Sequence, residues 1–102
     1  MDEKRIVNIG IEVLPLTDDA LPHVDRAIEA IIASGLRYEV GPLETTIEGP
    51  FDAAWEAAKQ AHLAAVRSSN GSVVTLIKIS DAPGGSMTMD EKTGKWRGGD
   101  SD

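Results

Sequence analysis

The sequence contains no cysteine, and this absence excludes several kinds of site at once. A chain without thiols cannot form a disulfide, a zinc–thiolate site, an iron–sulfur cluster or a cysteine nucleophile. The chain has two histidines, His23 and His62. No metal-ligand spacing and no Ser–His–Asp order can be assembled around either of them. We therefore expect no metal site and no catalytic residue, and we interpret both histidines as structural.

Long apolar runs and basic clusters are also missing. No apolar stretch approaches the roughly 20 residues that cross a bilayer, and the N-terminus lacks the apolar region of a signal peptide. The net charge is -7, from 10 Lys and Arg against 17 Asp and Glu, and the basic residues are scattered along the chain. A polyphosphate backbone would require a basic patch. We expect a cytoplasmic protein that binds neither membrane nor nucleic acid.

The apolar residues that are present suffice for one compact core. They make up 41% of 102 residues, which is enough for one domain and no more. We expect a single domain over residues 1–102, with its core over about 5–96 and a polar tail over about 97–102. Chain ends of this composition fray, here from about Gly98.

The first half of the chain reads as strand, helix, strand. Apolar alternation over residues 5–14 predicts a strand that Pro15 ends, because proline removes a ladder donor. A helical stripe then runs to about Ser34, with Asp18 or Asp19 as its cap and Gly35 in the left-handed position after it. A short alternating strand follows over residues 36–40.

The second half repeats this order after a tight connection at residues 41–42. We predict a strand over residues 45–49, a helix from about Pro50 to Arg67, and a strand over residues 73–79. The last strand is almost wholly apolar, as expected of a strand covered on both faces. We expect Trp55 in the core and a short turn capped by Ser86 or Thr88.

Two β-α-β units joined by a hairpin predict an α+β, ferredoxin-like βαββαβ fold. Right-handed crossovers place both helices on one face of a four-stranded antiparallel sheet, and we expect the first and fourth strands at its centre. Alternation places Val7, Ile9, Ile11 and Val13 on the helix side, and Ile6, Asn8, Gly10, Glu12 and Leu14 on the open face.

The open face carries aliphatic residues whichever set of the fourth strand joins it, either Val73, Thr75, Ile77 and Ile79 or Val74, Leu76 and Lys78. A contiguous apolar face on a small monomer is an interaction surface or an aggregation liability. We infer a homo-oligomer that buries its sheets face to face, with room for a ligand in a polar pocket at the interface.

Two polar groups lie on the predicted sheet. Glu12 and Lys78 would form an opposite-charge cross-strand pair, which is either an ordinary ion pair or a carboxylate that binds a cation or an aminopyrimidine. Thr45, Thr46 and Glu48, with Tyr38 on the neighbouring strand, form the second group. Threonine is common in strands for its shape alone, so this second signal is weak.

Two stretches of sequence resemble the small thiamine-binding protein family: Gly35-Leu36-Arg37-Tyr38-Glu39-Val40-Gly41-Pro42 and Thr45-Thr46-Ile47-Glu48-Gly49. The resemblance extends from residue 6 to about residue 96. It implies a ferredoxin-like homotetramer, arranged as a dimer of dimers. It also implies that thiamine or its hydroxymethylpyrimidine part binds near a subunit interface, without catalysis and without a further cofactor.

The resemblance also implies roles for individual residues. The hydroxyls of Thr45 and Thr46 would hold the ligand, and Tyr38 would border its ring. Asn8 and Glu12 would meet its hydrogen-bonding edge. The full expected ligand-binding set is Asn8, Glu12, Tyr38, Thr45, Thr46, Glu48 and Lys78.

Two other hypotheses remain open at this point. One is a structural or regulatory homo-oligomer whose open sheet face buries only protein, with no small-molecule ligand. The other is an enzyme acting on a small amine or acid, which would need a poised acid–base pair. Glu12 with His23 or His62 is a weak candidate for such a pair, so we rank the enzyme hypothesis last.

Overall fold

The computed structural model describes residues 1–96, so the expected polar tail over about 97–102, with its fraying from Gly98, lies outside the described residues. The main elements are β1 (Ile6–Pro15), α1 (Leu21–Ala33), β2 (Arg37–Val40), β3 (Thr45–Pro50), α2 (Phe51–Ser68) and β4 (Val73–Ser80). A short helix α3 (Met89–Thr93) and a 3-10 turn (Gly94–Trp96) follow. None of the helices described is both long enough and apolar enough to cross a membrane.

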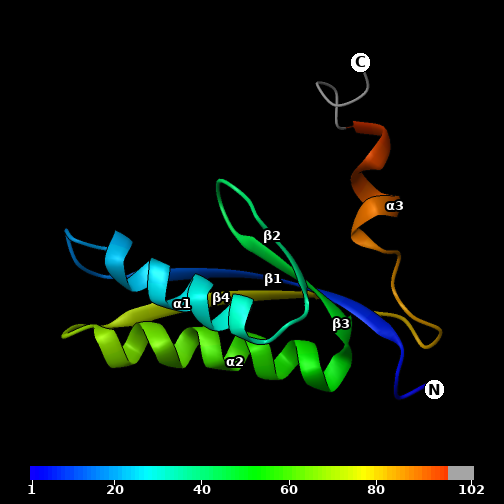
Figure 1. Cartoon of the computed structure of the whole chain (residues 1–102), viewed down its shortest axis with the longest axis horizontal. Helices are drawn as coiled ribbons and strands as arrows, with labels where there is room; N and C mark the ends of the chain where they lie inside the picture. The colour runs from blue at the N-terminus through cyan, green and yellow to red at the C-terminus, as the bar shows by residue number, and fades with distance from the viewer. Residues whose placement is uncertain (97–102) are drawn as a thin grey trace.

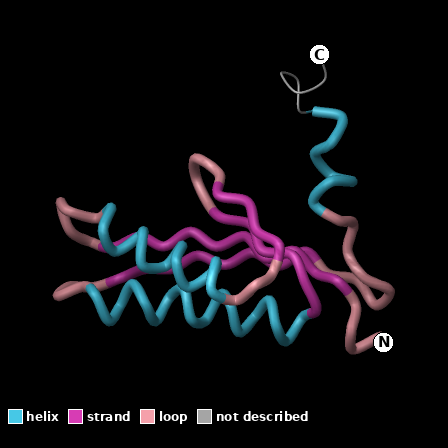
Figure 2. The backbone as a smooth tube through the Cα atoms, viewed as in Figure 1, coloured by secondary structure: helices cyan, strands magenta, loops and turns pink. Residues whose placement is uncertain are grey.

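The expected ferredoxin-like fold is confirmed. The four strands form one sheet in the order β2-β3-β1-β4, and each neighbouring pair is antiparallel. Helices α1 and α2 lie side by side against one face of this sheet (Figure 1). The segment that ends in α3 leaves the sheet at the opposite end from the α1–β1 connection and turns away from both long helices (Figure 2).

The prediction that the first and fourth strands are central is wrong, because β1 and β3 occupy the centre. A right-handed crossover joins two parallel strands and here leaves a gap one strand wide between them. Strand β3 fills the gap between β1 and β2, and β1 fills the gap between β3 and β4. Each unit therefore supplies one central and one edge strand, and β4 lies at an edge.

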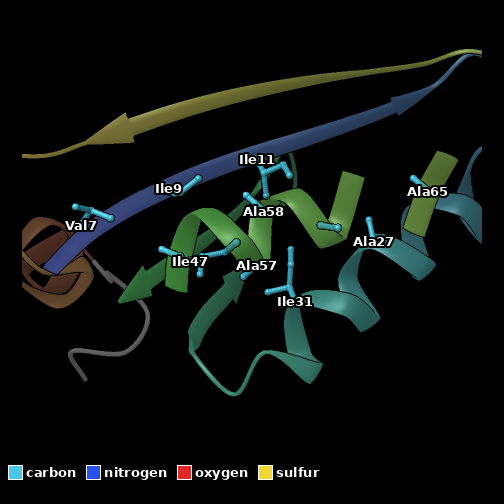
Figure 3. Packing of buried hydrophobic residues seen from close by; sticks show 11 residues of the cluster. Val7, Ile9, Ile11, Ala27, Ile31, Ile47, Ala57, Ala58 and Ala65 are labelled. Atoms are coloured by element: carbon cyan, nitrogen blue, oxygen red, sulfur yellow. The ribbon is translucent and has the colours of Figure 1, made fainter. Parts of the chain in front are cut away.

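The core lies between the sheet and the two long helices (Figure 3). Val7, Ile9 and Ile11 of β1 are buried there, which confirms their predicted side of the sheet. Their partners are Ile47, Ala27, Ile31 and the α2 alanines Ala54, Ala57, Ala58, Ala61 and Ala65. Short alanine side chains allow α2 to approach the strands closely, and each large aliphatic side chain of β1 then fills the space between them.

Two of four local expectations, on helix caps, a left-handed glycine and a core tryptophan, are confirmed. The N-cap of α1 is Ala20 without a side-chain hydrogen bond, so neither Asp18 nor Asp19 caps this helix. Gly35 has φ 76°, the left-handed conformation predicted for it, and Thr88 caps α3 as expected. Trp55 is 44% exposed and is not a core residue, because the buried stripe of α2 is made of alanines.

Strand β4 is covered on one face only within this chain. Val74 and Leu76 are 46% and 50% exposed, and their register partners Leu14 and Glu12 place them on the open face. The prediction that β4 is covered on both faces is therefore wrong for the single chain. The structure also settles which set of β4 residues shares the open face: it is the set of Val74, Leu76 and Lys78.

Candidate functional site

The open face carries two adjacent rows of side chains that cross all four strands. The glycine row contains Glu39, Thr46, Gly10 and Lys78, and the asparagine row contains Arg37, Glu48, Asn8 and Ser80. Alternate residues of a strand face the same side, so both rows point away from α1 and α2. Two residues of strand separate the rows by about 7 Å.

A cleft of about 390 Å³ lies over these two rows. The residues that line it are Asn8, Gly10, Glu39, Glu44, Thr46, Lys78, Ile79, Ser80, Met89, Lys92 and Thr93. The sheet forms the floor, while α3 and the β2–β3 connection form the walls. Pockets for small organic ligands measure about 300–1,000 Å³, so this cleft accommodates a compact heteroaromatic molecule.

Helix α3 is fixed over the asparagine row by polar contacts at three points. The backbone N–H of Met89 donates to Glu48 Oε2 at 3.1 Å. Arg37 donates two hydrogen bonds, of 2.8 and 2.7 Å, to the carboxylate of Asp90. Lys92 Nζ donates to Ser80 Oγ at 2.8 Å. These contacts make α3 a wall of the cleft although it leaves the body of the domain.

Hydrogen bonds also stabilise the ionised forms of Arg37 and Glu91 in this region. The hydrogen bonds from Arg37 to Asp90 raise the pKa of the Arg37 guanidinium above its ordinary value. At the start of α3, Thr88 and Glu91 form a reciprocal capping box. The backbone N–H of Thr88 donates to Glu91 and lowers the pKa of that carboxyl group. Arg37 and Glu91 are therefore charged at neutral pH, and the polar contacts that fix α3 are kept at that pH.

Asn8 lies in the floor of the cleft and is the most unusual polar residue of the site. Its side chain is 5% exposed, and within residues 1–96 its Nδ2 has no hydrogen-bond partner. Buried side-chain donors are almost always paired, because an unpaired one costs about 1–3 kcal/mol. Asn8 is also one of the residues that line the cleft.

The glycine row is crossed by an ion pair. Glu44, in the β2–β3 connection, has its carboxylate over Gly10, with Oε2 only 3.0 Å from where a β-carbon on that glycine would lie. Its Oε1 lies 3.1 Å from Lys78 Nζ, on the other side of β1. The absence of a side chain at Gly10 makes room for this carboxylate at the centre of the open face.

The structure brings four of the seven predicted site residues to these rows: Asn8, Thr46, Glu48 and Lys78. Glu12 lies on the same face beyond the cleft, opposite Leu76. The predicted cross-strand pair between Glu12 and Lys78 is therefore wrong, because Lys78 stands opposite Gly10 and bonds Glu44 instead. A shift of two residues along β1 is enough to separate them.

The other two, Tyr38 and Thr45, lie on the helix side of the sheet. Tyr38 is paired with Ile47, whose side chain is fully buried in the core. Thr45 is paired with Ile11 and is 6% exposed. Consecutive strand residues face opposite sides, so Thr45 and Thr46 cannot line one cleft of the same chain.

The sequence did not place Glu44, Ser80 or the segment after Thr88 at the candidate site. Thr88 was predicted as a possible cap of a short turn, and the capping-box pattern Thr88-x-x-Glu91 indicates the helix start, but neither signal places α3 over the sheet. Nothing local in the sequence indicates that Glu44 reaches across to Lys78. That contact depends on the shape of the β2–β3 connection.

The two histidines have ordinary hydrogen-bond partners outside the cleft. His23 Nδ1 lies 2.7 Å from Ser68 Oγ, and His62 Nδ1 lies 2.6 Å from Thr75 Oγ1. Both pairs join elements of the helix layer or its sheet face, which supports the structural interpretation. Over residues 1–96 there is no group of three or more His, Asp or Glu side chains that could hold a metal ion.

Comparison with known proteins identifies clear relatives. A family model described as "Thiamine-binding protein" matches residues 9–97. A UPF0045 protein of Clostridium perfringens is 39% identical over 92 residues, which cover 88% of this chain and 96% of that protein.

Two solved structures share the fold. The first, a domain of unknown function from Bacillus cereus, has a TM-score of 0.84 and 38% identity, over 95% of this chain and 96% of its own. The second, a candidate thiamine biosynthesis/salvage protein of Thermotoga maritima, has a TM-score of 0.80 and 34% identity, over 90% of this chain and 99% of its own.

Proposed function

Because the chain belongs to the thiamine-binding protein family, we propose that it binds thiamine, or the hydroxymethylpyrimidine part of thiamine, in the cleft over the two rows. One observation carries this proposal beyond family membership. The buried Nδ2 of Asn8 has no partner within residues 1–96, and it belongs to a residue that lines the cleft. A ligand that presents an acceptor there gains what the protein alone leaves unsatisfied.

An aminopyrimidine has the complementary chemistry. Its ring nitrogens accept hydrogen bonds, so one of them can take the donor of Asn8. Its exocyclic amine donates, and the Thr46 hydroxyl in the next row is an acceptor within the same cleft. The side chain of Met89 adds an apolar surface on the α3 side, which suits the flat face of a heteroaromatic ring.

We further propose that binding occurs without catalysis. Proton transfer would need an acid or base within reach of the ligand. The histidines are engaged with Ser68 and Thr75 instead, and neither lines the cleft. The cleft does contain carboxylates and ammonium groups, but Glu44 pairs with Lys78 and Lys92 hydrogen-bonds to Ser80, so we interpret them as groups that hold a ligand by hydrogen bonds and charge.

We also propose that a second copy of the chain covers the apolar part of the open face. Leu14, Val74 and Leu76 form this part, and they are 38%, 46% and 50% exposed. They lie together on β1 and β4, next to the polar rows, in a register that places Leu14 opposite Val74. An isologous contact over such a face would bury these residues and leave the cleft beside the interface.

The adjacent threonines provide a matched pair of variants for testing the site. We expect Thr46→Val to weaken binding of hydroxymethylpyrimidine about 5- to 150-fold, the equivalent of losing about 1–3 kcal/mol for an unpaired polar group. Thr45→Val makes the same chemical change on the helix side and should leave the affinity within about twofold. Isothermal titration calorimetry of both variants and the wild type measures the difference.

Two results would contradict the proposal in different ways. Equal affinities for the wild type and Thr46→Val would place the ligand elsewhere. If neither thiamine nor hydroxymethylpyrimidine binds the wild type, the structural homo-oligomer without a ligand becomes the better account.

A further inference from the structure

We propose that the cleft selects its ligand by charge: Glu44 recognises the cationic part of the ligand, and Lys78 competes with that part for the same carboxylate. This inference rests on the proposed function, since it assigns the two ends of one bound molecule to the two rows. It goes further by predicting which ligands bind better and by identifying the ion pair that decides this.

The position of Glu44 is the first observation. Its carboxylate lies against Gly10 in the centre of the open face, with both oxygens within 3.1 Å of where a β-carbon would be. The side chain is 31% exposed, so it is partly withdrawn from water. A partly desolvated carboxylate attracts a cation more strongly than a fully exposed one does.

The second observation is the unequal charge of the two rows. The asparagine row with α3 is balanced in formal charge. Arg37 pairs with Asp90 and lies 4.0 Å from Glu48, and Lys92, which hydrogen-bonds to Ser80, supplies the second positive charge. At the glycine row the formal charges are the carboxylates of Glu39 and Glu44 and the ammonium group of Lys78, and the positive charge of Arg37 in the neighbouring row also acts on Glu39. The cleft therefore has a neutral end and a negative end.

The Nδ2 of Asn8, which has no partner in the described part of the chain, provides independent support for a ligand at the neutral end. A pyrimidine bound there lies about 7 Å, one row, from the carboxylate over Gly10. Thiamine consists of a neutral pyrimidine joined through a single carbon to a positively charged thiazolium ring. With the pyrimidine on Asn8, the thiazolium reaches the glycine row and meets Glu44.

Lys78 is a displaceable partner for this carboxylate. Its side chain is 75% exposed, and its ion pair to Glu44 spans 3.1 Å at the surface of the cleft. Exposed pairs of this kind contribute little to stability, and a released lysine is well hydrated. Removal of Lys78 would free the carboxylate of Glu44 for the ligand. It would also remove a positive charge that repels a cationic ligand.

The experiment compares two probes on three proteins by isothermal titration calorimetry near neutral pH. Thiamine is the cationic probe and hydroxymethylpyrimidine is the uncharged one. We expect Glu44→Gln to weaken thiamine binding about three- to tenfold, and Lys78→Gln to strengthen it about two- to fivefold, while binding of the uncharged probe changes less than about twofold in both. Added salt should weaken thiamine binding to the wild type and reduce the difference between the variants.

The ion pair of Glu56 and Lys59 on α2 provides matched controls. It spans 3.9 Å on the helix layer, away from the cleft, so Glu56→Gln and Lys59→Gln make the same changes in net charge at a remote site. Neither control should alter the ratio of the two affinities. Circular dichroism establishes that each variant is folded.

The outcomes separate this inference from the proposed function. A change in the thiamine-to-pyrimidine affinity ratio confined to Glu44 and Lys78 supports charge selection. If both probes bind but the ratio is the same in all five proteins, charge selection is overturned while the ligand assignment stands. If neither probe binds the wild type, the proposed function fails and this inference fails with it.

Discussion

Replacement of Asn8 by leucine should change folding stability and ligand affinity in opposite directions. The side chain is 5% exposed, and its Nδ2 has no partner within residues 1–96, so the ligand-free protein carries an unsatisfied buried donor. Such a group costs about 1–3 kcal/mol, and an apolar side chain of similar size removes this cost. We therefore expect Asn8→Leu to raise the free energy of unfolding of the ligand-free protein by about 1 kcal/mol or more.

The same change should weaken hydroxymethylpyrimidine binding, because the ligand loses a donor that has no partner within residues 1–96. The expected loss is about 1–3 kcal/mol, or about 5- to 150-fold in Kd. Urea denaturation without ligand measures the first quantity, and isothermal titration calorimetry measures the second. Asn70→Ala, at an exposed turn, is the control and should leave the affinity unchanged.

A loss of stability in ligand-free Asn8→Leu would refute the reasoning, because it would mean that the amide already has a favourable partner. Unchanged affinity in a stabilised variant would also refute it, since the unsatisfied donor would then serve no ligand. Only the combination of higher stability and weaker binding identifies Asn8 as a residue kept for function.

Three further predictions follow from the structure. Leu76→Glu, on the open face, should reduce the sedimentation coefficient by breaking self-association while the circular dichroism spectrum stays that of the folded chain; an unfolded variant would contradict the placement of Leu76. Thr88→Ala removes the cap of α3 and should weaken ligand binding severalfold by loosening that wall of the cleft, with the melting temperature of the rest of the domain nearly unchanged; equal affinities by calorimetry would show that α3 does not form part of the site. Arg5 donates two hydrogen bonds to Asp81 and lowers the pKa of that carboxyl group, so the stabilisation is present above the unfolded-state pKa of about 3.9 and is lost as the pH falls through the lower folded-state value. The melting temperature of the wild type should therefore exceed that of Asp81→Asn by a constant amount from neutral pH to about pH 5, and the difference should shrink below about pH 4; a pH-independent difference would contradict this.

The fold could be predicted because each element had a strong local signal. The alternation of Val7, Ile9 and Ile11 fixed one face of β1, and Gly35 marked the end of α1. The strand order was predicted wrongly, because the expectation of a central β1 and β4 left out the gap that each crossover leaves for a strand of the other unit. These gaps place β1 and β3 at the centre, whatever the hydrophobicity of β4.

Some of the predicted site residues lie at the cleft and others do not, and the separation has a common cause. Motif resemblance selected Thr45 and Tyr38 together with Thr46, although the alternation of β3 places Thr45 on the helix side. Resemblance identifies a stretch of sequence, whereas a site depends on the face of each residue. Lys78 lies at the cleft, but the partner predicted for it, Glu12, is wrong, because strand register cannot be read to within two residues from sequence.

The central claim is that an aminopyrimidine binds over the asparagine row. A crystal structure of the protein with hydroxymethylpyrimidine tests it most directly. We expect a ring nitrogen of the ligand about 2.9–3.0 Å from Asn8 Nδ2, with the ring between the sheet and Met89. A ligand bound elsewhere, or an Asn8 amide that stays unpaired beside a bound ligand, would contradict the account.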